Sequence, residues 1–193
     1  MDRLVAQGIN LFRGERLVLR DFSCVVAAGG ALLLQGANGA GKSSALRLLA
    51  GLARPETGTV MFDGDSDLAG KVAMLGHLDA IKPGLSALDN LAFAARLSGR
   101  DARAALADFG LAGLAEVPAR LFSAGQKRRL ALARLSLSAA PLWLLDEPSV
   151  GLDHASVELL GAVLARHRAA GGVMVLATHL PLPLPDAGVM VLV

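Results

Sequence analysis

Short apolar runs, each bounded by turn residues, alternate along this chain with longer segments whose apolar positions recur every three or four residues. The short runs have the length of buried strands, and the longer segments have the spacing of one helix face. Strands that alternate with helices predict an α/β fold with a largely parallel sheet. The expected strands are residues 17–19, 25–26, 31–35, 59–62, 72–75, 141–145, 173–177 and 189–193.

Two regions depart from this alternation. Residues 4–35 alternate apolar and polar segments around a turn at 13–15, which predicts antiparallel strands at the start of the chain. Residues 81–121 have helical spacing and no strand run, so we expect a helical subdomain at about 78–138 within a single domain spanning 1–193. The expected helices are 44–50, one that begins after Ser86 as N-cap, 101–109, 123–138 and 155–170.

Composition favours a folded domain that has a partner. The chain has 193 residues, of which 53% are hydrophobic, and its mean hydropathy is +0.51. Such an apolar chain is expected to bury part of its surface against another protein. No apolar run approaches the roughly 18 residues that a membrane-spanning helix needs.

Charge and cysteine content argue against a nucleic-acid-binding protein and against an intrachain disulfide. The net charge is +2, from 19 basic and 17 acidic residues, and aromatic residues make up only 4% of the chain. Nucleic-acid binding is disfavoured, because basic residues are scattered and aromatic platforms are few. The single cysteine, Cys24, cannot form an intrachain disulfide and lies in an apolar run where burial is expected. The N-terminus shows no signal-peptide pattern, so we expect a cytoplasmic location.

The stretch from Gly36 to Ser43 reads G-A-N-G-A-G-K-S, which matches the phosphate-binding P-loop pattern G-x-x-x-x-G-K-[ST]. Its glycines let the backbone amides form a concave anion site, and the following helix adds its N-terminal partial charge. Lys42 can reach the β- and γ-phosphates, and the Ser43 hydroxyl can bind Mg²⁺. The expected nucleotide-binding residues here are Gly36, Ala37, Asn38, Gly39, Ala40, Gly41, Lys42, Ser43 and Ser44.

Asp146 and Glu147 follow a buried strand directly. In parallel α/β sheets, ligands bind at the carboxyl ends of the strands, so this acidic pair is expected to face the P-loop. Asp146 then suits a Mg²⁺ contact, and Glu147 can orient or deprotonate an attacking water. Taken alone, the pair could equally cap the next helix.

Two further segments carry polar groups beside expected strands or helices, where they could contact a ligand. His179 lies just after another buried strand and can orient the water or donate a hydrogen bond to the γ-phosphate, although a lone histidine is commonly structural. Residues 122–126, F-S-A-G-Q, precede a helix, so the Ser123 hydroxyl and the Gly125 backbone can form a second anion site. From the residues alone, an ordinary N-cap is the simpler interpretation of Ser123.

Together these segments resemble the ATP-binding subunits of ABC transporters over nearly the whole chain. Residues 122–126 are similar to the L-S-G-G-Q signature of that family, with Phe122 in place of Leu and Ala124 in place of the first Gly. Residues 149–153, S-V-G-L-D, look like the D-loop, which ends at Asp153. Asp146 and Glu147 match the Walker B aspartate and the catalytic glutamate, and His179 matches the switch histidine.

The resemblance implies a P-loop NTPase with an ABC-type nucleotide-binding fold, in which the helical subdomain is inserted into a RecA-like core. It implies an ATP hydrolase that uses ATP and Mg²⁺, with Glu147, His179 and Lys42 in catalysis and Ser43 and Asp146 as Mg²⁺ ligands. Two such domains sandwich two ATP molecules in this family, so a homodimer is expected. The signature residues would then act on the nucleotide of the partner: Ser123, Ala124, Gly125 and Gln126.

Two positions depart from the family pattern. His77 occupies the place of the Q-loop glutamine, and neutral imidazole is a poorer Mg²⁺ ligand than an amide oxygen. Arg13 occupies the place of the aromatic residue that stacks on adenine. A guanidinium can also stack on a base, and Phe12 is adjacent.

The stretch from Gly76 to Leu91 narrows the resemblance to the haem-exporter ATPases of bacterial cytochrome c maturation, the CcmA type. That resemblance implies integral-membrane transporter subunits as partners and a peripheral location on the cytoplasmic face of the bacterial inner membrane. The alternatives are an ABC ATPase of another exporter and a soluble ABC ATPase in assembly or regulation. A small-molecule P-loop kinase is a further alternative, which would transfer phosphate to an acceptor and not to water.

Overall fold

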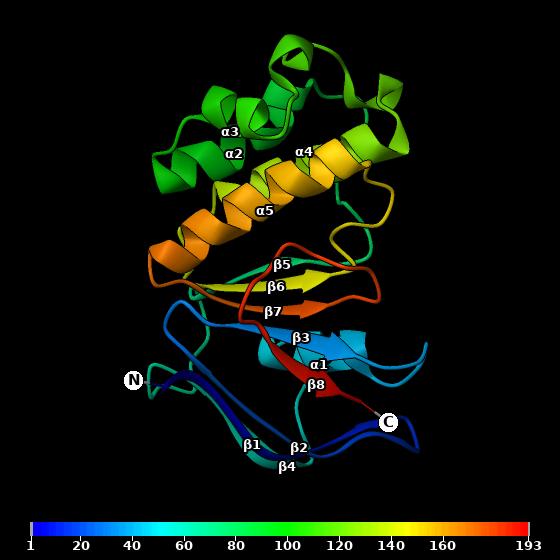
Figure 1. The fold of residues 1–193 in the computed structure, drawn as a ribbon, viewed down its shortest axis with the longest axis vertical. Coiled ribbons are helices and arrows are strands. Elements are labelled where there is room, and N and C mark those ends of the chain that lie inside the picture. Colours follow the sequence, from blue (N-terminus) through cyan, green and yellow to red (C-terminus); the bar gives the residue numbers. More distant parts are fainter. Residues whose placement is uncertain (1, 193) are drawn as a thin grey trace.

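The computed structural model describes residues 2–192 and contains two β-sheets and a layer of helices (Figure 1). One sheet is antiparallel, with strand order β2-β1-β4, and the other is parallel, with order β5-β6-β7-β3-β8. The strands are β1 (Asp2–Arg13), β2 (Arg16–Ala27), β3 (Ala31–Gln35), β4 (Thr57–Phe62), β5 (Val72–Leu75), β6 (Leu142–Asp146), β7 (Val173–Ala177) and β8 (Gly188–Val191). The helices are α1 (Lys42–Leu49), α2 (Ala87–Ser98), α3 (Ala102–Asp108), α4 (Ala124–Ser136) and α5 (His154–Ala169), with 3-10 turns at Ala112–Leu114 and Ala119–Leu121.

The central strands of the parallel sheet are buried on both faces, because α4 and α5 cover one face and α1 with the antiparallel sheet covers the other (Figure 1). Successive side chains of a strand point to opposite faces. Leu142 and Leu144 of β6 therefore join the core around α1, whereas Trp143 and Leu145 join the core beneath the helices. This explains why the strands read as continuous apolar runs.

Parallel pairing brings the carboxyl ends of four strands to one edge of the sheet. The register sets Leu75 of β5 opposite Leu145 of β6, and Asp146 of β6 opposite Ala177 of β7. Ala177 is also opposite Leu34 of β3, which leads into the P-loop. The loops after β3, β5, β6 and β7 consequently begin side by side.

Helices α2 and α3 lie outside α4 and α5, away from the sheets (Figure 1). The long helix α4 contacts α2 and α3 on one side and β5 on the other, so it connects this helical layer to the parallel sheet. Helix α2 begins after Ser86, as predicted, and the Ser86 hydroxyl accepts a hydrogen bond from the Asp89 backbone N–H at 3.0 Å.

The antiparallel strands are longer than the sequence predicts. Residues 17–19 and 25–26 belong to one strand, β2, because register shifts against β1 let a long strand bend and continue. Strand β4 begins at Thr57, two residues earlier than predicted. Strand β8 ends at Val191, and the predicted strand residue Val193 lies outside the described residues.

Two expectations from composition concern the burial of Cys24 and membrane-spanning helices. Cys24 is buried, and burial raises the pKa of its thiol to about 11. Cys24 and Val26 of β2 face the core between the antiparallel sheet and α1, whereas Val25 is exposed. None of the helices in residues 2–192 has both the length and the apolarity to cross a membrane.

Candidate active site

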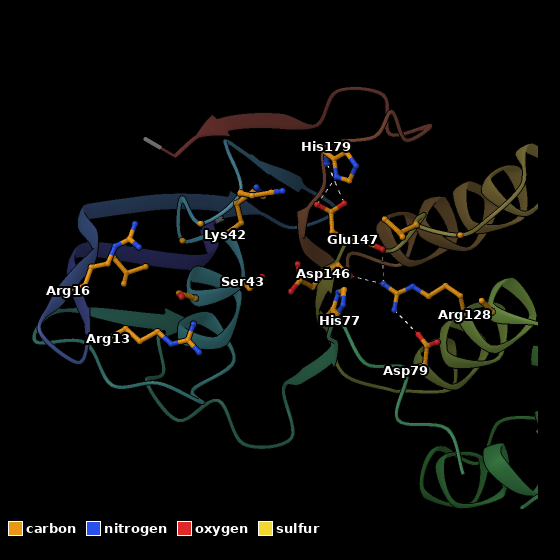
Figure 2. A pocket seen from close by; sticks show the side chains of 18 residues that line it. Arg13, Arg16, Lys42, Ser43, His77, Asp79, Arg128, Asp146, Glu147 and His179 are labelled. Carbon is orange, nitrogen blue, oxygen red and sulfur yellow. Dashed lines mark hydrogen bonds and ion pairs between the residues drawn. The ribbon is translucent and has the colours of Figure 1, made fainter. Parts of the chain in front are cut away.

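A cleft of about 700 Å³ opens where the loops after β3, β5, β6 and β7 meet the β1–β2 hairpin and the first turn of α4 (Figure 2). Most of the residues selected from the sequence line it: Arg13, Asn38, Gly39, Gly41, Lys42, Ser43, Ser44, His77, Ala124, Asp146, Glu147 and His179. Two lining residues, Val150 and Gly151, belong to the D-loop stretch 149–153, and four were not selected: Arg16, Val18, Asp79 and Arg128. The P-loop residues Gly36, Ala37 and Ala40 are not among the lining residues.

The P-loop presents the N-terminus of α1 to the cleft. Helix α1 begins at Lys42 after Gly41, which has a φ of +99°, and no side chain caps this helix end. Its first amide groups are therefore left for another acceptor, and they carry partial positive charge. Gly41 is required because a Cβ there would lie 2.9 Å from the Val18 carbonyl oxygen of β2. An anion is the ligand that this helix end accommodates.

The Lys42 side chain is buried and binds the backbone at the start of the P-loop. Its ammonium donates hydrogen bonds to the carbonyl oxygens of Gly36 at 2.6 Å and Ala37 at 3.0 Å. An ammonium has three N–H donors, so one donor remains for a ligand. Within residues 2–192, Lys42 forms no ion pair with a carboxylate, and a buried charge without a counterion is costly. A bound polyanion would supply that counterion.

Asp146 lies at the end of β6 with 7% of its surface exposed. In the described part of the chain, its backbone carbonyl accepts a hydrogen bond, but its carboxylate has no protein donor. A shielded carboxylate without a protein partner suits a cation. The Ser43 hydroxyl lines the same cleft, and one carboxylate with one hydroxyl fits Mg²⁺, which takes its other oxygens from phosphate and water.

Glu147 and His179 contact each other at the neighbouring ends of β6 and β7 (Figure 2). The Glu147 carboxylate lies 3.0 Å from His179 Nδ1, and it also accepts a hydrogen bond from the His179 backbone N–H at 3.4 Å. The Glu147 side chain is 19% exposed and that of His179 is 61% exposed. A half-shielded carboxylate paired with a solvent-accessible imidazole can hold and orient a water molecule.

The acidic pair does not cap the helix that follows it. Helix α5 begins at His154, and the Asp153 side chain caps it by accepting a hydrogen bond from the Ser156 N–H at 2.8 Å. The Ser156 side chain, and after it the Ser156 backbone N–H, lowers the pKa of Asp153. The capping interpretation of Asp146 and Glu147 is therefore wrong, and the D-loop residue Asp153 has a structural function of its own.

The signature residues lie mostly outside the cleft of their own chain. Among Ser123, Ala124, Gly125 and Gln126, Ala124 is the one that lines it. Ser123 caps α4 through a capping box: its hydroxyl accepts from the Gln126 N–H at 3.2 Å, and the Gln126 side chain accepts from the Ser123 N–H at 2.8 Å. The N-cap inferred from the residues alone is thus present, and it leaves the role of Ser123 toward a partner a prediction.

Two arginines of the β1–β2 hairpin face one end of the cleft. Arg13 and Arg16 are paired across the turn, both are exposed, and both line the cleft (Figure 2). Phe12 is 47% exposed but is not a lining residue, so it is not the base platform in this arrangement. Arg16 could have been found from the sequence, because a two-residue turn places it opposite Arg13.

His77 follows β5 by two residues and lines the cleft next to the end of β6 (Figure 2). In residues 2–192, no three His, Cys, Asp or Glu side chains are grouped so that they could hold a metal by themselves. His77 is thus close to the predicted metal position without completing a protein cage. A contact between His77 and Mg²⁺ or its water stays a prediction.

The sequence reasoning missed Arg128 and Asp79. Arg128 of α4 is buried, and its guanidinium forms an ion pair with Asp79 at 2.8 Å. A signal for it exists in the sequence. Arg128 lies three, four and seven positions before the apolar residues Ala131, Leu132 and Leu135, which places it on the buried stripe of the helix.

Comparison with known protein families gives one match, to the family model described as "ABC transporter", over residues 19–150. The chain is 53% identical over 183 residues to the "Cytochrome c biogenesis ATP-binding export protein CcmA" of Gluconobacter oxydans, covering 95% of this chain and 84% of that protein. It is 51% identical over 189 residues to the protein of the same name from Rhodospirillum rubrum, covering 93% of this chain and 81% of that protein.

Solved structures agree with this match. The "ATP binding subunit of ABC transporter" aligns with a TM-score of 0.83 at 26% identity, over 92% of this chain and 80% of that one. A putative ABC transporter ATP-binding protein from Pyrococcus furiosus aligns with a TM-score of 0.87 at 22% identity, over 98% and 97% of the two chains. The second likeness concerns the fold alone.

Proposed function

The chain belongs to the ATP-binding subunits of ABC transporters, within them to the CcmA type, and from this premise we propose that it powers haem export or delivery for c-type cytochrome biogenesis. As an ABC ATPase it binds and hydrolyses ATP. The main support for its mechanism is the convergence of the P-loop, the Asp146–Glu147 pair and His179 on one cleft. Residues 1–193 then form one ATPase domain, with residues 78–138 as its helical subdomain.

In the proposed mechanism, the triphosphate lies on the N-terminus of α1, where the P-loop amides and the free donor of Lys42 stabilise its charge. Ser43 and Asp146 would hold Mg²⁺, which would supply positive charge to the phosphate groups. Glu147 orients the water and accepts its proton, and His179 fixes the Glu147 carboxylate through the 3.0 Å contact. Positioning and electrostatic stabilisation account for the rate.

We also propose that the working unit is a homodimer. Ser123 does not line the cleft of its own chain, so it is available to contact a nucleotide held by a second copy. Its hydroxyl lies at the N-terminus of α4, whose partial positive charge would stabilise a γ-phosphate.

ABC ATPase subunits work with membrane components. We propose that this chain binds integral-membrane transporter subunits at the cytoplasmic face of the inner membrane. Exposed apolar side chains support a protein contact, among them Leu78, Phe93 and Leu97, which are 74–81% exposed.

The catalytic assignment is tested by replacing Glu147 with Gln. This change keeps the size of the side chain but replaces one carboxylate oxygen with an amide NH2 and so removes the base. ATP hydrolysis should therefore fall to background while equilibrium ATP binding is retained. Glu158→Gln is a matched control on the exposed face of α5 and should retain full turnover. Full turnover in Glu147→Gln would remove Glu147 from this role.

The cellular assignment requires a separate experiment. In a bacterium lacking its own copy of this gene, haem-stained c-type cytochromes should return with the wild-type chain and not with Glu147→Gln. Affinity purification from detergent-solubilised membranes should recover integral-membrane subunits together with the chain. Normal cytochromes in the deletion strain would instead favour another exporter, and recovery without membrane subunits would favour a soluble ATPase.

A further inference from the structure

Arg128 uses every hydrogen-bond donor of its guanidinium. Its five N–H groups meet five acceptors, and the residue is only 6% exposed. Nη2 donates to the carbonyl oxygens of Asp146 at 2.6 Å and Glu147 at 2.7 Å, and Nε donates to that of Pro148 at 3.3 Å. Nη1 donates to the Gly76 carbonyl at 3.2 Å and to the Asp79 carboxylate at 2.8 Å.

One end of this network holds the backbone that carries Glu147. Glu147 has a φ of +47°, a conformation that non-glycine residues adopt only when their surroundings stabilise it. The Arg128 guanidinium bonds the carbonyl of Glu147 and the carbonyls on both sides of it. The backbone N–H of Glu147 is fixed separately, by the Ala177 carbonyl at 2.8 Å. These contacts determine where the Glu147 side chain points.

The other end holds the segment 76–80, which follows β5. Besides the two bonds from Arg128, this segment accepts two from Arg134, six residues further along α4. These go to the carbonyls of Asp79 at 2.9 Å and Ala80 at 2.5 Å. The ion pair between Arg128 and Asp79 is shielded, with side chains 7% and 27% exposed. Helix α4 thus binds this segment and the Glu147 backbone through one side chain.

We propose, on the basis of the function proposed above, that Arg128 is a positioning residue that joins the segment 76–79 to the backbone of the catalytic Glu147. If the segment 76–79 shifts, the Arg128 guanidinium shifts with it. The backbone of residues 146–148 then moves, which changes the orientation of the Glu147 carboxylate toward the water. Because the bonds go to the backbone of residues 146–148, and not to the P-loop, Arg128 affects the rate of the chemical step and leaves ATP affinity unchanged.

The test compares Arg128→Met and Arg128→Lys with wild type in the intact chain. Steady-state hydrolysis gives kcat and KM, and equilibrium titration gives the Kd and the number of ATP sites per chain. Removing the guanidinium should lower kcat about 10- to 100-fold at unchanged Kd and site number, because small misplacement of a catalytic group has effects of this size. Lysine offers three donors in place of five, so it should restore only part of the rate.

Asp79→Asn provides a second variant that keeps the guanidinium. It should lower kcat several-fold, and combined with Arg128→Met it should add no further loss, because the two residues share one interaction. Arg166→Gln is the matched control: this arginine pairs with Asp108 on the outer surface, so kcat should not change.

Each remaining outcome contradicts the assignment. Unchanged kcat in Arg128→Met would show that Glu147 needs no such support. Loss of ATP sites in proportion to kcat would make Arg128 a residue of general stability, and a raised Kd would make it a nucleotide contact. Additive losses in the double variant would separate Asp79 from Arg128. Failure of the proposed function is distinct, because wild type itself would then not hydrolyse ATP.

Discussion

Arg13 stands where the family resemblance leads one to expect an aromatic platform for adenine, and Arg16 is paired with it across the turn. Both side chains are exposed and line the cleft, and neither forms a hydrogen bond or ion pair within residues 2–192. A planar guanidinium can stack on a base. Stacking at such a solvent-accessible place is weak, so these residues should make only a small contribution to the affinity for ATP.

We therefore predict that Arg13→Ala weakens ATP binding about two- to fivefold, the equivalent of about 0.5–1 kcal/mol. The affinity for inorganic tripolyphosphate, which has no base, should change less. Fluorescence or calorimetric titration of both ligands measures the difference. Arg20→Ala, an exposed arginine further along β2, is the control. An equal loss for ATP and tripolyphosphate would assign Arg13 to the phosphates.

Helix α5 is fixed to the parallel sheet by an aromatic contact. His167 stacks on Trp143 of β6, with ring centroids 3.9 Å apart and an interplanar angle of 13°. Burial lowers the pKa of His167 below its ordinary value of 6.5, although the carbonyls of Val173 and Pro141 act in the opposite direction. The neutral imidazole is therefore the form that packs between helix and sheet.

The folded-state pKa of His167 lies below the unfolded value, so its contribution to stability is present above pH 6.5 and is lost as the pH falls through the folded pKa. We predict that His167→Phe flattens the decline of Tm between pH 7 and about pH 5. A difference of about 1 kcal/mol corresponds to roughly 2–4 °C in a chain of this length. His154→Gln, an exposed histidine at the start of α5, should leave the decline unchanged.

The first turns of α2 and α4 allow a matched comparison of two helix caps. Ser86 and Ser123 each accept a hydrogen bond from the N–H three residues later, at 3.0 and 3.2 Å. Ser86→Ala and Ser123→Ala should each lower the free energy of unfolding by about 1 kcal/mol. Only Ser123→Ala should also lower ATP hydrolysis. Equal hydrolysis in both variants, measured beside urea unfolding curves, would limit Ser123 to capping.

For the molecule as a whole, the proposed homodimer predicts complementation. Lys42→Ala removes a P-loop contact, and Ser123→Ala removes a contact supplied to the partner, so each homodimer is expected to be inactive. A mixed dimer contains one site with both residues intact, and hydrolysis should return when the two variants are combined. Activity that stays absent in the mixture, while sedimentation shows mixed dimers, would mean that Ser123 acts on its own chain.

The fold class and most elements could be predicted because their signals are local. The P-loop, the Ser86 cap and the buried strands are encoded within a few consecutive residues, and parallel pairing then brings Asp146, Glu147 and His179 together. Strand extents in the antiparallel sheet could not be predicted, because register shifts against β1 depend on the partner strand.

By itself, the sequence determined which chemistry the chain carries: a triphosphate loop, an acidic pair and a histidine at strand ends. The helical spacing of residues 128–135 also indicates that Arg128 is buried, although our sequence analysis missed it. Only the tertiary structure decided what Arg128 binds, because its acceptors lie 18 to 52 residues away along the chain. The same holds for Ser123, whose absence from its own cleft follows from how α4 packs against the sheet. Contacts between distant segments depend on tertiary packing, which a local sequence pattern does not predict.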